Sequence, residues 1–262
     1  MVRDLRLSRT LWAITAALAF AAALGGVLFR GIYAGLFPED FLPGALAQDV
    51  LTMLVCLLLF VLAAVTRPEH VKRQVVVIGL LGSLFYLYGI FTIERVYNSF
   101  YLLYAAVFAF SFWSIVLSLA GFKPEAFAHL RLSRGMLRTT AFASIFIAVV
   151  FTVLWVASLI PLMREHNRIE NLYSIYILDL CFVMPAFLIT AVMSLRRMPL
   201  GVLMGPAIMI LGFFVIFPLG LNEVAKPSAG LPLNVGPMVV SFAFAFFMLA
   251  VAALQLSKIR LE

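Results

Sequence analysis

An acidic residue lies inside an apolar stretch of the chain, where Asp179 stands between Leu178 and Leu180. Placing a carboxylate against lipid costs about 2.5–3.5 kcal/mol on insertion scales, so we expect this side chain to face the interior of a helix bundle. It is then protonated, paired with a cation such as Arg95, or in contact with water. Such a group can bind an ion, a proton or a polar ligand. Its alternative role is a structural hydrogen bond to a neighbouring helix.

Other polar side chains are expected at a similar depth, near the outer ends of the helices. Those that we assign to the same ligand site are Asp49, Glu94, Arg95, Asn98, Tyr101, Tyr104 and Tyr176. Together with Asp179 they predict an outward-open pocket in which carboxylates and phenols surround one arginine. The alternative for any single tyrosine is a place in the aromatic belt at the membrane interface.

The segment 100–121 and the turn before it carry a polar stripe. At 100° per residue its members fall within an arc of about 140°, which is one face of a helix; they are Tyr97, Tyr101, Tyr104, Ser111, Ser114 and Ser118. Small polar residues let helices approach closely, so the stripe favours tight packing. The second interpretation is that it lines a cavity or a path.

The elements that position these residues follow from composition. The chain has 262 residues, of which 65% are hydrophobic and 12% charged, and its mean hydropathy is +1.11. A membrane-spanning helix needs about 20 apolar residues, and eight such runs are present, at 11–29, 45–66, 74–93, 100–121, 139–162, 173–194, 202–220 and 236–256. Because lipid offers the backbone no hydrogen-bond partners, these runs must be helices. The sequence therefore predicts an all-α polytopic membrane bundle that forms a single domain over 1–262.

The basic residues indicate orientation. Of the 19 Lys and Arg residues, 14 fall in one set of alternate loops and 5 in the other. Since basic residues are held on the cytoplasmic side, both termini are expected there. The net charge of +7 arises from these short loops, which contain no groove-reading motif, so we expect the lipid bilayer as partner and no nucleic acid.

Several kinds of membrane chemistry are disfavoured. His70, His129 and His166 all fall in loops, so neither a haem ligand pair nor a helical zinc motif can be assembled. Cys56 and Cys181 lie in different spans and form no redox motif. We therefore expect no cofactor and no metal, and an enzyme is the less favoured class.

A proline follows the acid in the sixth run. Pro185 lacks an N–H, so it frees a helical carbonyl and predicts a kink. The pattern Leu178-Asp179-Leu180, Pro185, then 196–201 (RRMPLG) resembles uncharacterised bacterial multi-pass inner-membrane proteins, as does Tyr97-Asn98 followed by 100–104 (FYLLY). The resemblance implies a protein of the bacterial cytoplasmic membrane and carries no activity.

The predicted function is binding of a small molecule or ion, linked to transport or sensing, because ionisable residues inside membranes are usually functional. One alternative is a non-catalytic membrane subunit or scaffold, with a membrane partner or a second copy of the chain, or a protein docked on the basic inner loops. The third is a lipid-modifying enzyme that uses Asp49, Glu94 or Asp179 as acid or base.

Overall fold

The computed structural model describes residues 5–29, 31–121, 130–169 and 172–261. Its helices are α1 (Leu5–Leu28), α2 (Leu42–Val65), α3 (Val71–Ile93), α4 (Tyr101–Ala120), α5 (Arg134–Glu165), α6 (Tyr173–Leu178), α7 (Met184–Leu195), α8 (Pro199–Ala225) and α9 (Val235–Lys258). Three short helical turns adjoin them: η1 (Glu39–Phe41), η3 (Asp179–Val183) and η4 (Lys226–Ala229). Two short strands, β1 (Leu130–Arg131) and β2 (Arg260–Leu261), pair antiparallel.

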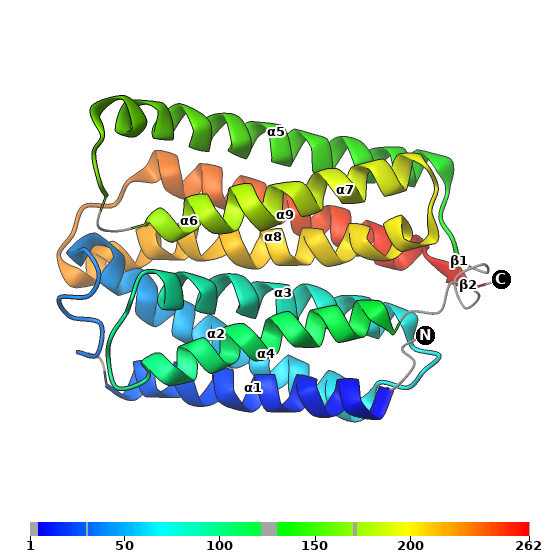
Figure 1. The fold of residues 1–262 in the computed structure, drawn as a ribbon, viewed down its shortest axis with the longest axis horizontal. Coiled ribbons are helices and arrows are strands. Elements are labelled where there is room, and N and C mark those ends of the chain that lie inside the picture. Colours follow the sequence, from blue (N-terminus) through cyan, green and yellow to red (C-terminus); the bar gives the residue numbers. More distant parts are fainter. Residues whose placement is uncertain (1–4, 30, 122–129, 170–171, 262) are drawn as a thin grey trace.

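Within the described residues, eight helical segments are long and apolar enough to cross a membrane. Five of these segments are the single helices α1, α3, α4, α5 and α9. Two include an adjoining turn, η1 before α2 and η4 after α8. The sixth segment in sequence consists of α6, η3 and α7, which follow one another without a break. The predicted all-α membrane bundle of eight spans is confirmed. The first residue of α1 and the last of α9 lie at the same end of the bundle (Figure 1).

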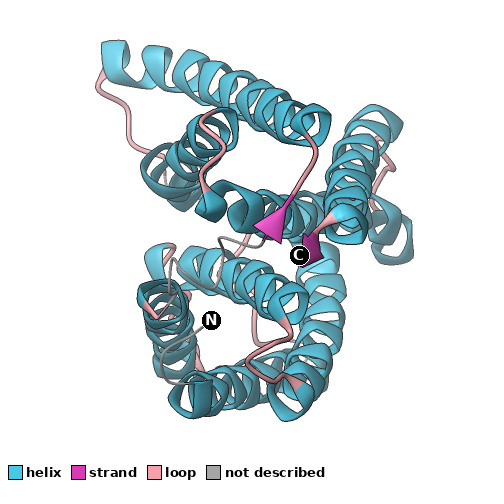
Figure 2. Ribbon diagram, turned by 90° about the vertical axis from the view of Figure 1, so that its right-hand side faces the viewer, coloured by secondary structure: helices cyan, strands magenta, loops and turns pink. Residues whose placement is uncertain are grey.

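The helices form two groups, which Figure 1 shows side by side and Figure 2 shows end-on. In one group α1 packs on α2 and α4, and α3 packs on α4. In the other, α7 packs on α5, and α8 packs on α7 and α9. Contacts of α8 with α2 and α3 join the groups. Accordingly, 67% of the residues in an apolar 18-residue stretch of the α8 span are buried, against 11% for α5.

The polar stripe of α4 faces α1. Trp12 Nε1 donates to Ser118 Oγ at 3.1 Å, and the hydroxyls of Thr15 and Ser114 lie 3.3 Å apart. Ser114 and Ser118 are buried between the two helices. At Ser114 and Ser118 the stripe therefore makes helix contacts, which is the first of its two predicted roles.

The sixth span has a local change of helix type. Met184 N–H donates to Asp179 O, five residues back, so residues 179–183 form a π-helical turn. Pro185 is the second residue of α7 and has no N–H of its own to donate. The kink predicted at Pro185 stays a prediction, and the change of helix type lies just before it, at 179–183.

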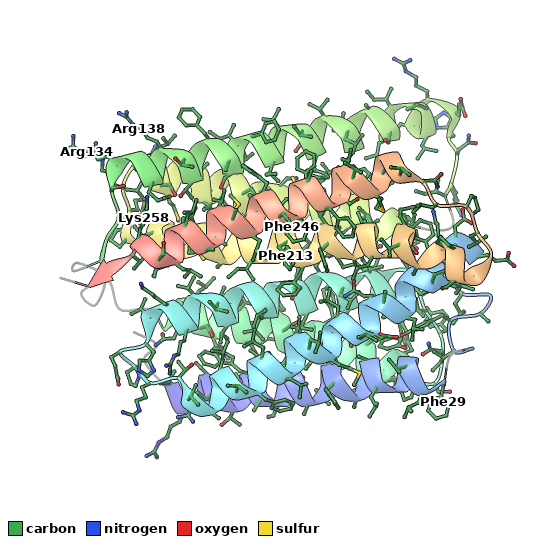
Figure 3. All side chains as sticks on the ribbon, turned by 180° about the vertical axis from the view of Figure 1, so that it is seen from behind. Phe29, Arg134, Arg138, Phe213, Phe246 and Lys258 are labelled. Carbon is green, nitrogen blue, oxygen red and sulfur yellow. The ribbon has the colours of Figure 1, made fainter. Side chains whose placement is uncertain are left out.

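Basic residues gather at the end of the bundle that we assign to the cytoplasm. Arg134, Arg138 and Lys258 lie at the end opposite Phe29 (Figure 3). At the same end Arg9 Nη2 donates to Ala64 O at 2.7 Å, beside the C-terminus of α2. A cation there satisfies carbonyls that the helix leaves free and complements the helix dipole.

Candidate functional site

The predicted site residues lie in two separate places. One set forms an outer acid cluster, which we define as Tyr33, Asp49, Asn98 and Tyr104, inside the α1–α4 group. Asp179 lies in the other group, where α5, α7, α8 and α9 meet around it. The described residues thus do not form the one pocket that the sequence predicted.

Asp49 and Tyr33 hold the outer acid cluster together. Tyr33 Oη donates to Asp49 Oδ2 at 3.0 Å, and only 1% of Asp49 is exposed. Burial, and secondarily the nearby Asp49 carboxylate, raise the pKa of Tyr33 far above its ordinary value, so the phenol stays protonated and remains a donor. Asn98 Nδ2 donates to Tyr104 Oη at 3.1 Å, which fixes the buried end of the cluster.

A close approach of α1 to α2 encloses the carboxylate. A Cβ added at Gly26 would lie 1.9 Å from Asp49 Oδ2 and 2.6 Å from Tyr33 Oη. Only glycine leaves room for both groups at this point. The end of α1 and the loop after it therefore cover Asp49.

The same glycine and tyrosine line a large cavity. Its volume is about 720 Å³, and it lies between the outer ends of α1, α2 and α8. The lining residues are Gly26, Tyr33, Glu39, Leu42, Pro43, Leu46, Ala47, Val50, Leu221, Ala225, Ser228, Ala229 and Leu231. We call this space the outer cavity. Its wall is mostly apolar, Glu39 is its one charged lining residue, and Asp49 stands behind Gly26 and Tyr33.

Replacing Tyr33 with Phe removes the hydroxyl that Asp49 accepts from. We expect this change to lower the free energy of unfolding by about 1 kcal/mol, because a buried acceptor loses its partner. Titration with sodium dodecyl sulfate, followed by circular dichroism, measures the loss. Tyr97→Phe is the control, since Tyr97 is 65% exposed and its hydroxyl should be dispensable. Equal stability of Tyr33→Phe and the unaltered protein would contradict the assigned bond.

Asp179 is buried, with 4% of its surface exposed, and its partner is a tryptophan. Trp155 Nε1, on α5, donates to Asp179 Oδ2 at 2.6 Å. Arg95, which the sequence offered as one possible partner, does not pair with Asp179, because Arg95 is exposed and its guanidinium carbon lies 5.7 Å from the centre of the Tyr173 ring. Arg95 follows the end of α3 with φ 58°, in a turn outside the bundle interior.

The remaining predicted residues make contacts between elements. Glu94 Oε1 accepts from Ser174 N at 2.8 Å, which satisfies an N–H in the first turn of α6. Tyr101 Oη donates to the carbonyl of Thr92 at 3.2 Å. Tyr176 packs edge-on against the indole of Trp155, with ring centroids 5.4 Å apart. Glu94 and Tyr101 thus join α3 to its neighbours, and Tyr176 supports the partner of Asp179.

Sequence reasoning missed Tyr33 and Trp155. The N–H of a tryptophan within an apolar span needs an acceptor, and Asp179 is the one acid deep within an apolar run, so the sequence contained a signal for this pair. No such signal marked Tyr33, which lies in the short loop after α1. Its side chain reaches into the bundle only because Gly26 leaves room for it. Among the described residues, no group of three or more His, Cys, Asp and Glu could hold a metal ion.

Comparisons with protein families, with curated proteins and with solved structures found no match to this chain. Its function is therefore inferred from geometry.

Proposed function

We propose that this multi-pass membrane protein binds a small amphipathic cation in the outer cavity, as a step in transport or sensing. The observation that carries the proposal is the outer cavity itself, at about 720 Å³. Ligand sites are typically clefts of about 300–1,000 Å³ with mostly apolar walls and a few polar groups. Both its size and its lining fit that description.

The charge of the expected ligand follows from the lining residues. Glu39 is exposed at the rim of the cavity and carries the only formal charge among them. A cationic group of the ligand would pair with this carboxylate while its apolar body contacts the aliphatic wall. Tyr33 offers a hydroxyl and an aromatic face, which also attracts cations. If the ligand displaced the Tyr33 hydroxyl, its cation would next meet Asp49.

Two ions of nearly equal shape and opposite charge test the proposal. Tetraphenylphosphonium should raise the thermal unfolding temperature of the protein in nanodiscs, whereas tetraphenylborate should not. A ligand that binds only the folded state stabilises it in proportion to the logarithm of its concentration. Equal stabilisation by both ions would show partition into lipid and would overturn the proposal.

Matched variants locate the binding. Ala47→Trp fills the outer cavity from α2 and should abolish the shift given by tetraphenylphosphonium. Ala109→Trp places the same side chain on an exposed position of α4, so it should keep the shift. Glu39→Gln should weaken binding without abolishing it, because it removes the charge and retains the apolar wall. An undiminished shift in Ala47→Trp would place the binding elsewhere.

A second candidate function is that of a membrane subunit, and the surface of α5 favours it. Helix α5 has 32 residues, yet only 11% of the residues in its apolar 18-residue stretch are buried. Its exposed large side chains include Phe142, Phe146 and Val153. A second copy or another membrane helix would cover this face. Native mass spectrometry from mild detergent should then give a complex larger than one chain, and a single chain of 29.0 kDa would oppose this candidate.

A further inference from the structure

Asp179, which lines a small apolar cavity, has one buried oxygen atom without a hydrogen-bond partner among the described residues. Its Oδ2 accepts from Trp155, whereas Oδ1 is buried and makes no hydrogen bond with the described residues. The residue lines a cavity of about 20 Å³ whose other lining residues, from α5, α7, α8, α9 and η3, are all apolar. A space of about 10–15 Å³ already admits one water molecule. The cavity beside Asp179 therefore has room for one water molecule.

The backbone at this point is also short of hydrogen bonds. Met184 N–H donates to Asp179 O instead of Leu180 O, four residues back. The next possible donor to Leu180 O would be Pro185, which has no N–H. Leu180 O therefore has no donor within the helix. Single π-helical turns of this kind are frequent at functional sites.

The groups facing Asp179 leave its charge uncompensated. The lining contributed by α5 is Ile147 and Phe151, and that of α8 and α9 is likewise aliphatic or methionine. Among the residues that the structure describes, the titratable side chain that another element brings near the carboxyl is Tyr86 of α3, which is neutral. Cys181, on the same element, is exposed. An ionised carboxylate among such neighbours is costly, and taking up a proton removes the cost.

We propose that Asp179 is a reversible proton-binding site in the α5–α9 group, with Trp155 as the side chain that responds to its charge. The step adds one proton from water to the carboxylate and forms one O–H bond, with no other covalent change. Asp179 is the only lining residue with side-chain oxygens, and it has two, whereas metal cations such as Ca²⁺ take six or more oxygen ligands, so a proton fits better than a metal cation. The outer cavity shares no lining residue with this one, and the inference does not depend on the proposed function.

The fluorescence of Trp155 can report whether Asp179 is protonated. A hydrogen bond to an ionised acceptor is shorter and stronger than one to a neutral acceptor, so the environment of the indole changes when Asp179 titrates. The chain has three tryptophans, and Trp12→Phe with Trp113→Phe leaves Trp155 as the only one. The fluorescence of Trp155 in nanodiscs should then follow a one-proton titration curve as pH is varied. A flat signal over the whole pH range in which the protein stays folded would overturn the proposal.

Variants in this background identify the titrating group. Asp179→Asn keeps an oxygen that can accept from Trp155 and should abolish the titration. Tyr176→Phe keeps the ring against Trp155 and removes one hydroxyl, so the curve should be unchanged. Tyr86→Phe removes a phenol near the carboxyl and leaves Asp179 in place, so the one-proton curve should remain and its midpoint should change. Persistence of the curve in Asp179→Asn would show that another group titrates.

Tyr86→Phe provides a readout that does not depend on the folding of Asp179→Asn, because it leaves Asp179 in place. Replacing sodium chloride with choline chloride separates the two classes of cation. An unchanged midpoint supports a proton site. A midpoint that rises when sodium is removed would show that sodium competes for the carboxylate and would overturn the proposal in favour of a sodium site.

Discussion

Replacing Lys226 with Met should lower the free energy of unfolding by about 3 kcal/mol, the lower end of the range for breaking a buried ion pair. Lys226 Nζ lies 2.6 Å from Glu223 Oε1, and the two side chains are only 8% and 10% exposed. Without the ammonium group, the Glu223 carboxylate remains buried beside the outer end of α8 with no counter-charge. Titration with sodium dodecyl sulfate, followed by circular dichroism, measures the loss.

The double variant Glu223→Gln with Lys226→Met is the control for this charge effect. Gln retains an oxygen that can accept from Asn234 N, which Glu223 Oε2 does at 3.1 Å. With both charges removed, most of the lost stability should return, because buried pairs contribute little beyond their own desolvation. If the double variant is as unstable as Lys226→Met, the loss comes from packing of the lysine stem. The pair also has a positional role, since η4, which Lys226 begins, provides Ser228 and Ala229 to the outer cavity.

Gly79→Ala should lower the free energy of unfolding by about 2 kcal/mol, within the usual range for an overpacked interior. The added Cβ would lie 2.7 Å from Ile210 Cβ and 2.8 Å from the carbonyl oxygen of Ala207. A backbone atom cannot rotate away, so α3 and α8 must separate. Because the contact between these two helices joins the two groups, the whole bundle should unfold at lower denaturant.

Gly135→Ala is the matched control for Gly79→Ala. Gly135 lies in the first turn of α5, and nothing stands within 4 Å of a Cβ built there. Alanine in a helix is favoured over glycine by about 0.5–1 kcal/mol, so this variant should be as stable as the unaltered protein or more so. Equal effects of the two substitutions would mean that the close approach at Gly79 does not limit packing.

The eight spans could be predicted because lipid imposes a length and a helical backbone on every apolar run. Helix ends were less certain: Arg134–Glu165 extends beyond 139–162 at both ends, since helix turns continue past the apolar core. The free-energy cost of a carboxylate in lipid was enough to predict that Asp179 faces the bundle interior.

Partners between helices could not be predicted in the same way. Helical spacing tells which residues share a face, but not which neighbouring helix that face meets or at what height. Arg95 was chosen for Asp179 because it is a cation near the outer side, yet it follows the last residue of α3 in a left-handed turn. The real partner, Trp155, comes from a helix whose placement depends on the packing of α5 on α7. The separation of Asp179 from the outer acid cluster could not be predicted for the same reason, since it depends on which helices pack together.

The small β-ladder between Leu130–Arg131 and Arg260–Leu261 has a consequence for biogenesis. Its first strand leaves the ribosome before α5, and its second only after α5 to α9 have all been synthesised. The N-terminal end of α5, a helix with few neighbours along its length, is thus fixed late in translation. Until then this helix is held chiefly by α7, so it is the span most open to rearrangement during insertion.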